Sequence, residues 1–285
     1  MLSKRDRLFL AAQQLQALIC PVCGEALSRS ADGFICPRRH SLNVNRKGCL
    51  NLLSAPVETY YDAALFQARR RVFDAGCYDA VADAIEALLP PHEQRILDAG
   101  CGDGWYLNWL LTRHPDWCGA GEDISKEAVL QATDHPCTAL WGVADLRRLP
   151  FAEGSFTAVL DVLTPASYDA FRRVLAPGGM LIKVFPGSEY LREIRQARGM
   201  ARYEEGQVYA YLREKTQVTD SRRVTVTHAV TPELWRDFVW MTPLNQDLSA
   251  EEKEALAAQP APCVTVDLHI AACRWQDEPV SASAP

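Results

Sequence analysis

The sequence lacks the two features that would place the protein in or beyond a membrane. No stretch of its 285 residues approaches the roughly 20 consecutive apolar residues that a membrane-spanning helix needs. Residues 1–19 begin basic and then turn apolar, as a signal peptide does. However, three glutamines between positions 13 and 16 interrupt the apolar stretch, and no small-residue cleavage site follows. We therefore predict no membrane partner and a cytoplasmic protein, with residues 1–19 forming an amphipathic helix or a disordered leader.

The sequence also lacks the cysteine pattern of a disulfide framework, and it lacks a net positive charge. Ten cysteines spread over 285 residues are too sparse for a small scaffold held by disulfides. The clustered cysteines indicate a metal site, and the others indicate reduced thiols in the core. The formal net charge of −6 argues against a nucleic-acid partner unless the charge is unevenly distributed.

The charge is unevenly distributed. Residues 1–71 hold 11 Lys and Arg against 5 Asp and Glu, whereas the remainder holds 19 against 31. A basic first quarter attached to an acidic body is expected of a module that faces a polyanion, although a solvated charged face would give the same counts. With 48% apolar residues the chain can bury a sizeable core, and its length fits one large domain, alone or with a small one.

A metal-ligand motif lies in the basic quarter. Cys20 and Cys23 are followed after twelve residues by Cys36 and His40, which together supply three thiolates and one imidazole. This is a complete tetrahedral set for structural zinc, with no open position for catalysis. The short strands predicted between the two ligand pairs have little core of their own, so we expect zinc to supply the folding free energy of this module.

Basic side chains follow the ligands and recur on the next helix. Contacts from such side chains to phosphates would give affinity without reading the base sequence. Residues 48–53 have the pattern of a strand that returns to the main domain, 54–62 that of a linker, and 65–78 and 79–89 those of helices. The candidate RNA-binding residues are Arg38, Arg39, Arg46, Lys47, Arg69 and Arg70.

The chain is organised around residues 95–105, R-I-L-D-A-G-C-G-D-G-W. A short apolar strand ends at Asp98, and an apolar helix follows the glycines Gly100, Gly102 and Gly104. Strand, glycine turn and helix form the opening unit of a doubly wound α/β domain, whose ligand lies beyond the carboxyl ends of the strands. Glycine is needed where the backbone takes positive φ or approaches a ligand closely. The spacing G-x-G-x-G differs from the dinucleotide fingerprint G-x-G-x-x-G.

This pattern of acid and glycines resembles motif I of the class I S-adenosylmethionine-dependent methyltransferases. The resemblance implies that Asp98, Asp103 and the glycines surround the cofactor, and that an acid ending the second strand holds both ribose hydroxyls. Glu122 and Asp123 follow a strand-like run about twenty residues on. The motif alignment favours Asp123, with Glu122 as the alternative. An ordinary surface turn with an Asp ahead of the helix cap Ser125 is the competing interpretation.

The alternation of strand and helix continues beyond this point. A third strand at 138–143 precedes Asp145, which the class resemblance assigns to the adenine amino group, although a plain turn residue would fit equally. A fourth strand is predicted at 155–163. Methyltransferases that act on adenine amines share an Asn/Asp-Pro-Pro-aromatic signature after this strand, and this sequence lacks it. The sequence therefore argues against methylation of an adenine amine.

The order of the motifs resembles a narrower family, the large-subunit ribosomal RNA guanine-N1 methyltransferases of the RlmA type. The matching segments are the zinc ligands, Lys47–Leu53, Gln67–Tyr78 and Leu97–Gly104. The resemblance implies that the zinc module contributes to RNA recognition and that Tyr78 and Tyr190 lie at the cofactor. It also implies that no dedicated catalytic acid exists beyond the cofactor site.

We predict an α/β fold of the class I methyltransferase (Rossmann-like) type, with a seven-stranded sheet, helices on both faces, and a small N-terminal zinc-binding module. The predicted segments are the leader 1–19, the zinc and RNA-recognition module 20–53, the linker and helices 54–94, the methyltransferase domain 95–276 and a disordered tail 277–285.

The predicted reaction is methyl transfer from S-adenosyl-L-methionine to N1 of a guanine in large-subunit ribosomal RNA. The alternatives are a methyltransferase for another RNA position or a small molecule, and a non-catalytic RNA-binding relative. Asp161 and Tyr190 are the candidates for removing the guanine proton. A homodimer is left open.

Overall fold

The computed structural model describes residues 2–53, 57 and 63–275. Nearly all of the predicted linker and the whole predicted tail lie outside these residues. The helices are α1 (Lys4–Leu15), α2 (Ala63–Asp74), α3 (Asp79–Glu86), α4 (Trp105–Arg113), α5 (Lys126–Ala132), η1 (Leu146–Arg148), α6 (Tyr168–Val174), α7 (Arg192–Ala197), α8 (Gly206–Lys215), α9 (Pro232–Met241), η2 (Pro243–Asn245) and α10 (Ala250–Ala257). The strands are β1 (Ser28–Arg29), β2 (Gly33–Ile35), β3 (Ser41–Asn43), β4 (Leu50–Asn51), β5 (Arg95–Ala99), β6 (Cys118–Asp123), β7 (Leu140–Val143), β8 (Phe156–Val162), β9 (Leu175–Pro186), β10 (Gln217–Ala229) and β11 (Cys263–Arg274).

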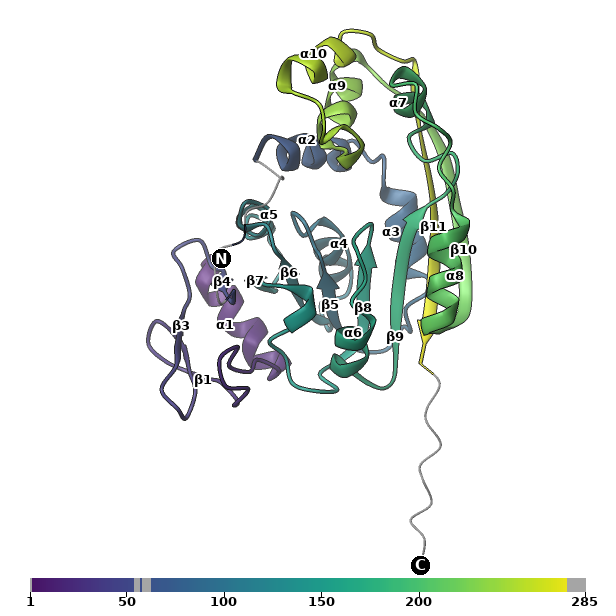
Figure 1. Cartoon of the computed structure of the whole chain (residues 1–285). Coiled ribbons are helices and arrows are strands. Elements are labelled where there is room, and N and C mark those ends of the chain that lie inside the picture. Colours follow the sequence, from purple (N-terminus) through teal and green to yellow (C-terminus); the bar gives the residue numbers. More distant parts are fainter. Residues whose placement is uncertain (1, 54–56, 58–62, 276–285) are drawn as a thin grey trace, which may run out of the picture.

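The main sheet confirms the predicted class of fold. Its strand order within the described residues is β10-β11-β9-β8-β5-β6-β7-β4, with β11 antiparallel to both of its neighbours and the remaining pairs parallel (Figure 1). The first long strand, β5, lies in the middle, and the chain extends the sheet from it in both directions. Such a switch point leaves a crevice at the carboxyl ends of the strands, where doubly wound folds bind their ligands.

The sheet has one strand more than the seven predicted. The additional strand is β4, which pairs in parallel with β7 through Leu50 opposite Gly142 and Asn51 opposite Val143. The sequence predicted a strand returning to the main domain here, but two residues are too few to signal membership of the sheet. Leu50 is fully buried, and burial of this side chain against the sheet edge is what favours the pairing.

Two clusters of buried apolar residues cover the two faces of the sheet. Successive strand residues point to opposite faces, so Ile96 and Leu160 belong to one cluster while Leu97 and Val159 belong to the other. Helices α2, α3, α4, α5, α9 and α10 contribute to the first cluster, and α1 and α6 contribute to the second. The central parallel strands are therefore buried on both sides, as parallel sheets require, whereas the edge strand β10 is mostly exposed.

The N-terminal leader forms a helix. Ser3 and Asp6 make a reciprocal capping box at the start of α1, which explains why the helix begins there. Its buried side chains, Leu8 and Phe9 among them, pack in the second cluster, and α1 lies against β6 and β7. Arg7 donates hydrogen bonds to the carbonyl oxygens of Thr133 and His135. Of the two alternatives predicted for residues 1–19, the helix is the one observed.

The arginine-rich segment in the last third is helical over only part of its length. α7 ends at Ala197, and Gly199 takes a positive φ of 64° just beyond it. The segment from 198 to 205 then runs as turns and extended chain towards α8. In the part of the chain that the structure describes, every helix is too short or too polar to span a bilayer.

Candidate functional site

The glycine turn between β5 and α4 has the backbone that the sequence predicted. Gly100, Gly102 and Gly104 all have positive φ, between 56° and 77°. A Cβ on Gly104 would lie 2.5 Å from the ring of Trp141, and a Cβ on Gly100 would lie 2.7 Å from the hydroxyl oxygen of Thr164. Glycine is therefore required here both for conformation and for close packing.

A cavity of about 310 Å³ opens above this turn. One wall consists of the glycine turn and the carboxyl ends of β5, β6 and β8, and the other consists of α2, the loop after β9, α7 and the end of α9. Aromatic side chains, arginines and carboxylates share the lining. The lining includes Phe66, Arg69, Phe73, Tyr78, Asp98, Gly102, Asp103, Asp123, Thr164, Tyr190, Arg195, Tyr203 and Met241–Leu244.

Asp123 is the acid of the β6 end that faces the cavity. Its carboxylate accepts hydrogen bonds of 2.8 Å from the backbone N–H groups of Gly102 and Ser125, so it fixes the glycine turn against the next helix. Ser125 caps α5, as predicted. Glu122 points into the opposite side of the sheet, is fully buried and does not line the cavity. Burial raises the pKa of Glu122 well above its usual value, which favours a neutral carboxyl.

Asp98 lies at the bottom of the cavity with an unsatisfied oxygen. It is 1% exposed, and its Oδ2 atom has no hydrogen-bond partner among the described residues. Burial, followed by the nearby charges of Asp123 and Asp103, raises the pKa of Asp98 to about 8. A buried carboxyl in this state is ready to pair with a cation, which would restore its charge. Asp98, Asp123 and the glycine turn, here called the glycine cradle, therefore fit a cationic ligand.

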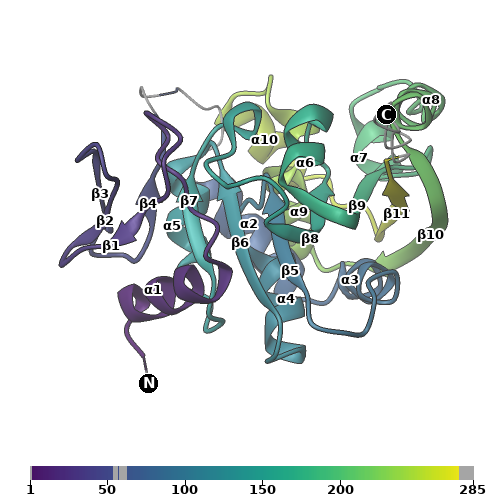
Figure 2. The ribbon, with the colours of Figure 1, turned by 90° about the horizontal axis from the view of Figure 1, so that it is seen from below.

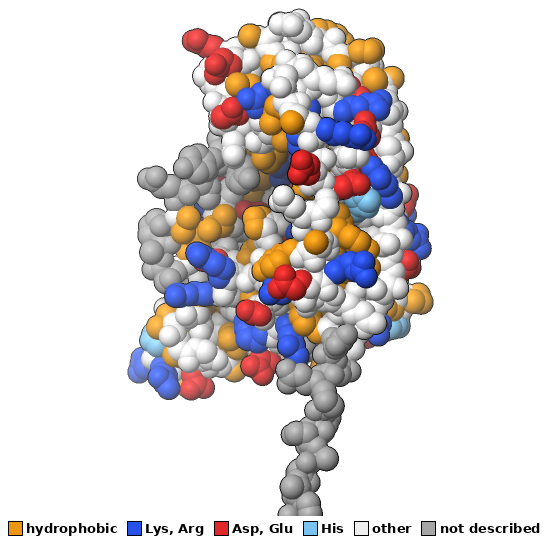
Figure 3. Space-filling model, turned by 45° about the vertical axis from the view of Figure 1, so that its right-hand side comes forward, with side chains coloured by type: hydrophobic (Ala, Val, Ile, Leu, Met, Phe, Trp, Pro, Cys, Tyr) orange, Lys and Arg blue, Asp and Glu red, His pale blue; other side chains and the backbone are white. Residues whose placement is uncertain are grey.

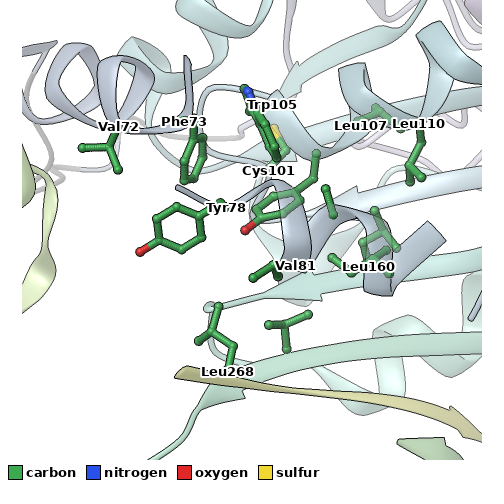
Figure 4. Packing of buried hydrophobic residues seen from close by; sticks show 14 of the residues in the cluster. Val72, Phe73, Tyr78, Val81, Cys101, Trp105, Leu107, Leu110, Leu160 and Leu268 are labelled. Atoms are coloured by element: carbon green, nitrogen blue, oxygen red, sulfur yellow. The ribbon is translucent and has the colours of Figure 1, made fainter. Parts of the chain in front are cut away.

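Two phenols line the same cavity as Asp98. The hydroxyls of Tyr78 and Tyr190 are 2.8 Å apart. The ring of Phe73 packs edge-on against Tyr78, with ring centres 4.8 Å apart, and Figure 4 shows these two rings. Burial is the main cause that raises the pKa of both tyrosines. Tyr190 therefore stays protonated near neutral pH, a state in which it cannot take up a proton from a substrate.

Asp103 forms an ion pair with Arg70, one of the residues predicted to bind RNA. Arg70 donates from Nε to Asp103 at 2.6 Å, and Asp103 is nearly fully buried. Arg69 lines the cavity beside Gly102, with its guanidinium 5.2 Å from the ring centre of Phe66. Both arginines therefore lie at the glycine turn, Arg69 in the cavity lining and Arg70 paired with Asp103.

Neither Asp161 nor Asp145 lines the cavity. Asp161 is fully buried behind the cavity wall and pairs with Lys183 at 2.8 Å. Burial raises the pKa of Asp161 to about 6, and Lys183 opposes that rise. Asp145 accepts hydrogen bonds from Arg147 and caps η1, outside the cavity lining. The turn interpretation of Asp145 is the one that its geometry supports.

Lys183 was missed by the sequence analysis. It also donates to the carbonyl oxygen of Thr164 at 2.6 Å, and Thr164 packs on Gly100. The ion pair thus holds the loop after β8 over the cavity, and Leu163 in this loop takes a positive φ of 56°. A lysine inside an apolar strand was the available signal, because an unpaired lysine is almost never buried.

The predicted zinc ligands converge. The Sγ atom of Cys20 is 3.6 Å from Nδ1 of His40, that of Cys36 is 3.5 Å from the same nitrogen, and the Sγ atoms of Cys23 and Cys36 are 3.7 Å apart. All four ligand atoms lie within 4.8 Å of one another. Tetrahedral zinc with Zn–S of about 2.3 Å and Zn–N of about 2.0 Å gives edges of this size. The donor set and the spacing fit a closed structural zinc site.

The zinc-binding module extends from one end of the main sheet. Its strands form the antiparallel sheet β1-β2-β3, which lies beyond β4 and next to α1 (Figure 2). The four predicted RNA contacts of this module are exposed, and Arg38 lies 3.7 Å from Glu25. They are Arg38, Arg39, Arg46 and Lys47.

Comparisons with known proteins agree with this architecture. A family model described as "Methyltransferase domain" matches residues 96–179, and a zinc-ribbon model described as "RlmA, N-terminal" matches residues 18–59. YxjB of Bacillus subtilis, provisionally named a 23S rRNA (guanine-N(1)-)-methyltransferase, is 40% identical over 190 residues, which cover 62% of this chain and 67% of YxjB.

A second relative is the 23S rRNA (guanine(748)-N(1))-methyltransferase of Streptomyces fradiae. It is 30% identical over 220 residues, which cover 74% of this chain and 79% of the relative. The two family models match the methyltransferase region and the zinc module, which the structure joins through β4. The chain therefore belongs to the RlmA-type family of 23S rRNA guanine-N1 methyltransferases, class I enzymes that depend on S-adenosyl-L-methionine.

Proposed function

We propose that the protein methylates N1 of a guanine in large-subunit ribosomal RNA, in the cytoplasm. One observation carries the proposal: the same chain contains the acid-lined glycine cradle and a zinc module with four ligands. This module also carries exposed basic residues. A methyltransferase of small molecules has no need of the second part. Family membership supports the same substrate class.

The proposed donor site uses the residues of the glycine cradle. Asp123 accepts from the ribose hydroxyls, and Asp98 faces the positively charged methionine part. Arg69 is the cation available for the methionine carboxylate, since it lies beside Gly102 and has no carboxylate partner within 4.0 Å among the described residues. When bound, S-adenosyl-L-methionine supplies a methyl group on a sulfonium leaving group.

The protein's own contribution is to hold the acceptor. The target guanine leaves its stack and enters the cavity between the loop after β8 and the end of α9. Thr164 and the 241–244 segment line this space. Because neither Asp161 nor Tyr190 is suited to take the N1 proton, catalysis depends on alignment and on the charges that surround the guanine.

Two measurements test the proposal. Ribosomal RNA from cells with and without the gene should differ by one methyl group on one guanine, located by mass spectrometry of nuclease fragments. The purified protein should restore that methyl group on RNA from the deletion strain. Methylation of a small molecule that persists after Cys23→Ser, with no change in ribosomal RNA, would favour a small-molecule enzyme. Absence of S-adenosyl-L-methionine binding by calorimetry would favour a non-catalytic RNA-binding protein.

A further inference from the structure

Four arginines occupy α7 and the turn after it, and three of them are neutralised. Arg192 pairs with Glu193 at 3.0 Å, Arg198 pairs with Asp247 at 2.7 Å, and Arg202 pairs with Glu189. Figure 3 shows that basic and acidic side chains are intermingled on this side of the molecule. These three arginines therefore tie the segment to its surroundings.

The fourth arginine, Arg195, differs from the other three in its partners and in its position. No carboxylate among the described residues lies within 4.0 Å of it, and its side chain lines the cavity. One guanidinium N–H donates to the carbonyl oxygen of Ala201 at 3.0 Å, and the guanidinium carbon is 5.4 Å from the ring centre of Tyr203. Its Nε atom is buried without a hydrogen-bond partner in the described structure.

An unpaired, partly buried cation costs free energy that a folded protein recovers when an anionic group binds. Burial lowers the pKa of Arg195, which is consistent with an environment that lacks a counter-charge. The carboxylates Asp98 and Asp123 belong to the other wall of the cavity, around the glycine turn. Arg69 also lies at that turn, so the single carboxylate of the methyl donor has a cation there. Arg195 remains for the acceptor.

We propose that Arg195 donates hydrogen bonds to O6 of the target guanine as its N1 proton is lost, and so makes N1 nucleophilic at neutral pH. This inference rests on the proposed function. The N1–H bond breaks, its proton passes to solvent water, and the electron pair stays on the ring, shared between N1 and O6. N1 then bonds to the methyl carbon while the methyl–sulfur bond breaks and leaves its electron pair on sulfur. The guanidinium opposes the negative charge at O6, as a charge-assisted hydrogen bond does.

The phenols near Arg195 do not ionise in the pH range over which the reaction rate is to be measured. The phenols that share the cavity are Tyr78, Tyr106, Tyr190 and Tyr203, and the pKa of each is raised with burial as the main cause. They therefore stay neutral between pH 6 and pH 9. Asp98 titrates in this range without ligand, so the measurements use saturating methyl donor.

The experiment compares Arg195→Ala and Arg195→Lys with the matched control Arg202→Ala, an exposed arginine of the same segment. Single-turnover methyl transfer to an rRNA fragment is measured from pH 6 to pH 9 at saturating RNA and donor. We expect Arg195→Ala to be slower by roughly 10² to 10³-fold at pH 7. Its rate should keep rising with pH above the point where the wild-type rate levels off, with Arg195→Lys between the two. Arg202→Ala should match the wild type at every pH.

Binding measurements separate this role from the other roles of an arginine. Dissociation constants for RNA, by filter binding, and for S-adenosyl-L-methionine, by calorimetry, should change less than threefold in Arg195→Ala. A rate reduced equally at all pH values would overturn the proposal and indicate a structural role. Weakened RNA binding with an unchanged rate at saturation would indicate a phosphate contact, and lost donor binding would place Arg195 at the donor carboxylate. If wild-type protein methylates no guanine N1, the proposed function itself fails.

Discussion

Binding of the methyl donor should release a proton from Asp98. The pKa of Asp98 is raised to about 8 without ligand, first by burial and then by Asp123 and Asp103. At pH 7, one unit below that value, roughly nine-tenths of the carboxyl groups are protonated. A cationic ligand binds the ionised form, so close to one proton should leave for each molecule bound. Affinity should then rise about tenfold per pH unit below the pKa.

Titration calorimetry measures this linkage directly. Between pH 5.5 and 7.0 the amino group of the ligand stays protonated, since α-amino groups titrate near 8. The observed enthalpy at pH 6.5 should differ between phosphate and imidazole buffers by the difference in their ionisation enthalpies, multiplied by about one proton. Asp98→Asn should bind more weakly, with no buffer dependence and no rise in affinity over this range.

The control variant is Glu122→Gln. Glu122 is also a buried carboxyl with a raised pKa, but it does not line the cavity. Its variant should therefore keep the wild-type proton release. Equal enthalpies in the two buffers for the wild type, or the same loss of linkage in both variants, would refute the assignment of Asp98 to the cation.

The same ionisation affects the stability of the ligand-free protein. The folded-state pKa of Asp98 lies above the value of 3.8 in an unfolded chain, so the native state favours the protonated form. Its contribution to stability is complete below about pH 4 and is lost as the pH rises through about 8. Denaturant unfolding should show this decline in the wild type, and Asp98→Asn should remove that part of it.

Three further changes probe the supports of the site. Lys183→Met leaves Asp161 buried without its partner, so the free energy of unfolding should fall by about 3 to 5 kcal/mol. Replacing both residues by apolar ones should restore most of this free energy. A loss below about 1 kcal/mol in Lys183→Met would contradict the role assigned to the pair. Gly104→Ala adds a Cβ 2.5 Å from Trp141 and should cost roughly 2 to 4 kcal/mol, whereas Gly178→Ala, also at positive φ but with nothing within 4 Å, should cost about 1. Chelation of zinc, or Cys23→Ser, should weaken RNA binding in a filter assay while leaving donor binding unchanged; equal loss of both would show that the metal supports the whole fold.

The cavity wall that carries the glycine turn could be predicted from the sequence because its residues lie close together in the chain. Asp98, the glycines and Asp123 span two strands and the turn between strand and helix, and the local backbone requirements fix their spacing. The zinc ligands could be predicted for the same reason. Their convergence depends on two tight turns rather than on long-range packing, so spacing alone carried the information.

The opposite wall of the cavity, which faces the acceptor in the proposed function, could not be predicted because packing between distant segments creates it. Arg195 and the residues 241–244 are about fifty positions apart, and both are far from the glycine turn. The arginine-rich stretch was visible in the sequence, but nothing local distinguishes Arg195 from Arg198. Only the position of Asp247 shows which arginine is neutralised and which is left to face the cavity.

Contacts fix the position of the zinc module relative to the methyltransferase sheet. An RNA that binds both parts must therefore match the distance between them. β4 continues the main sheet through β7, Leu18 bridges to Phe151, and Arg5 of α1 donates to the carbonyl oxygen of Asp32 in the module. The exposed basic residues thus lie at a fixed distance from the cavity. In the proposed function, an RNA segment bound at Arg46 and Lys47 must place its guanine at that distance, so specificity would come from the shape of the folded RNA as well as from contacts to the base. A flexible tether would have no such constraint.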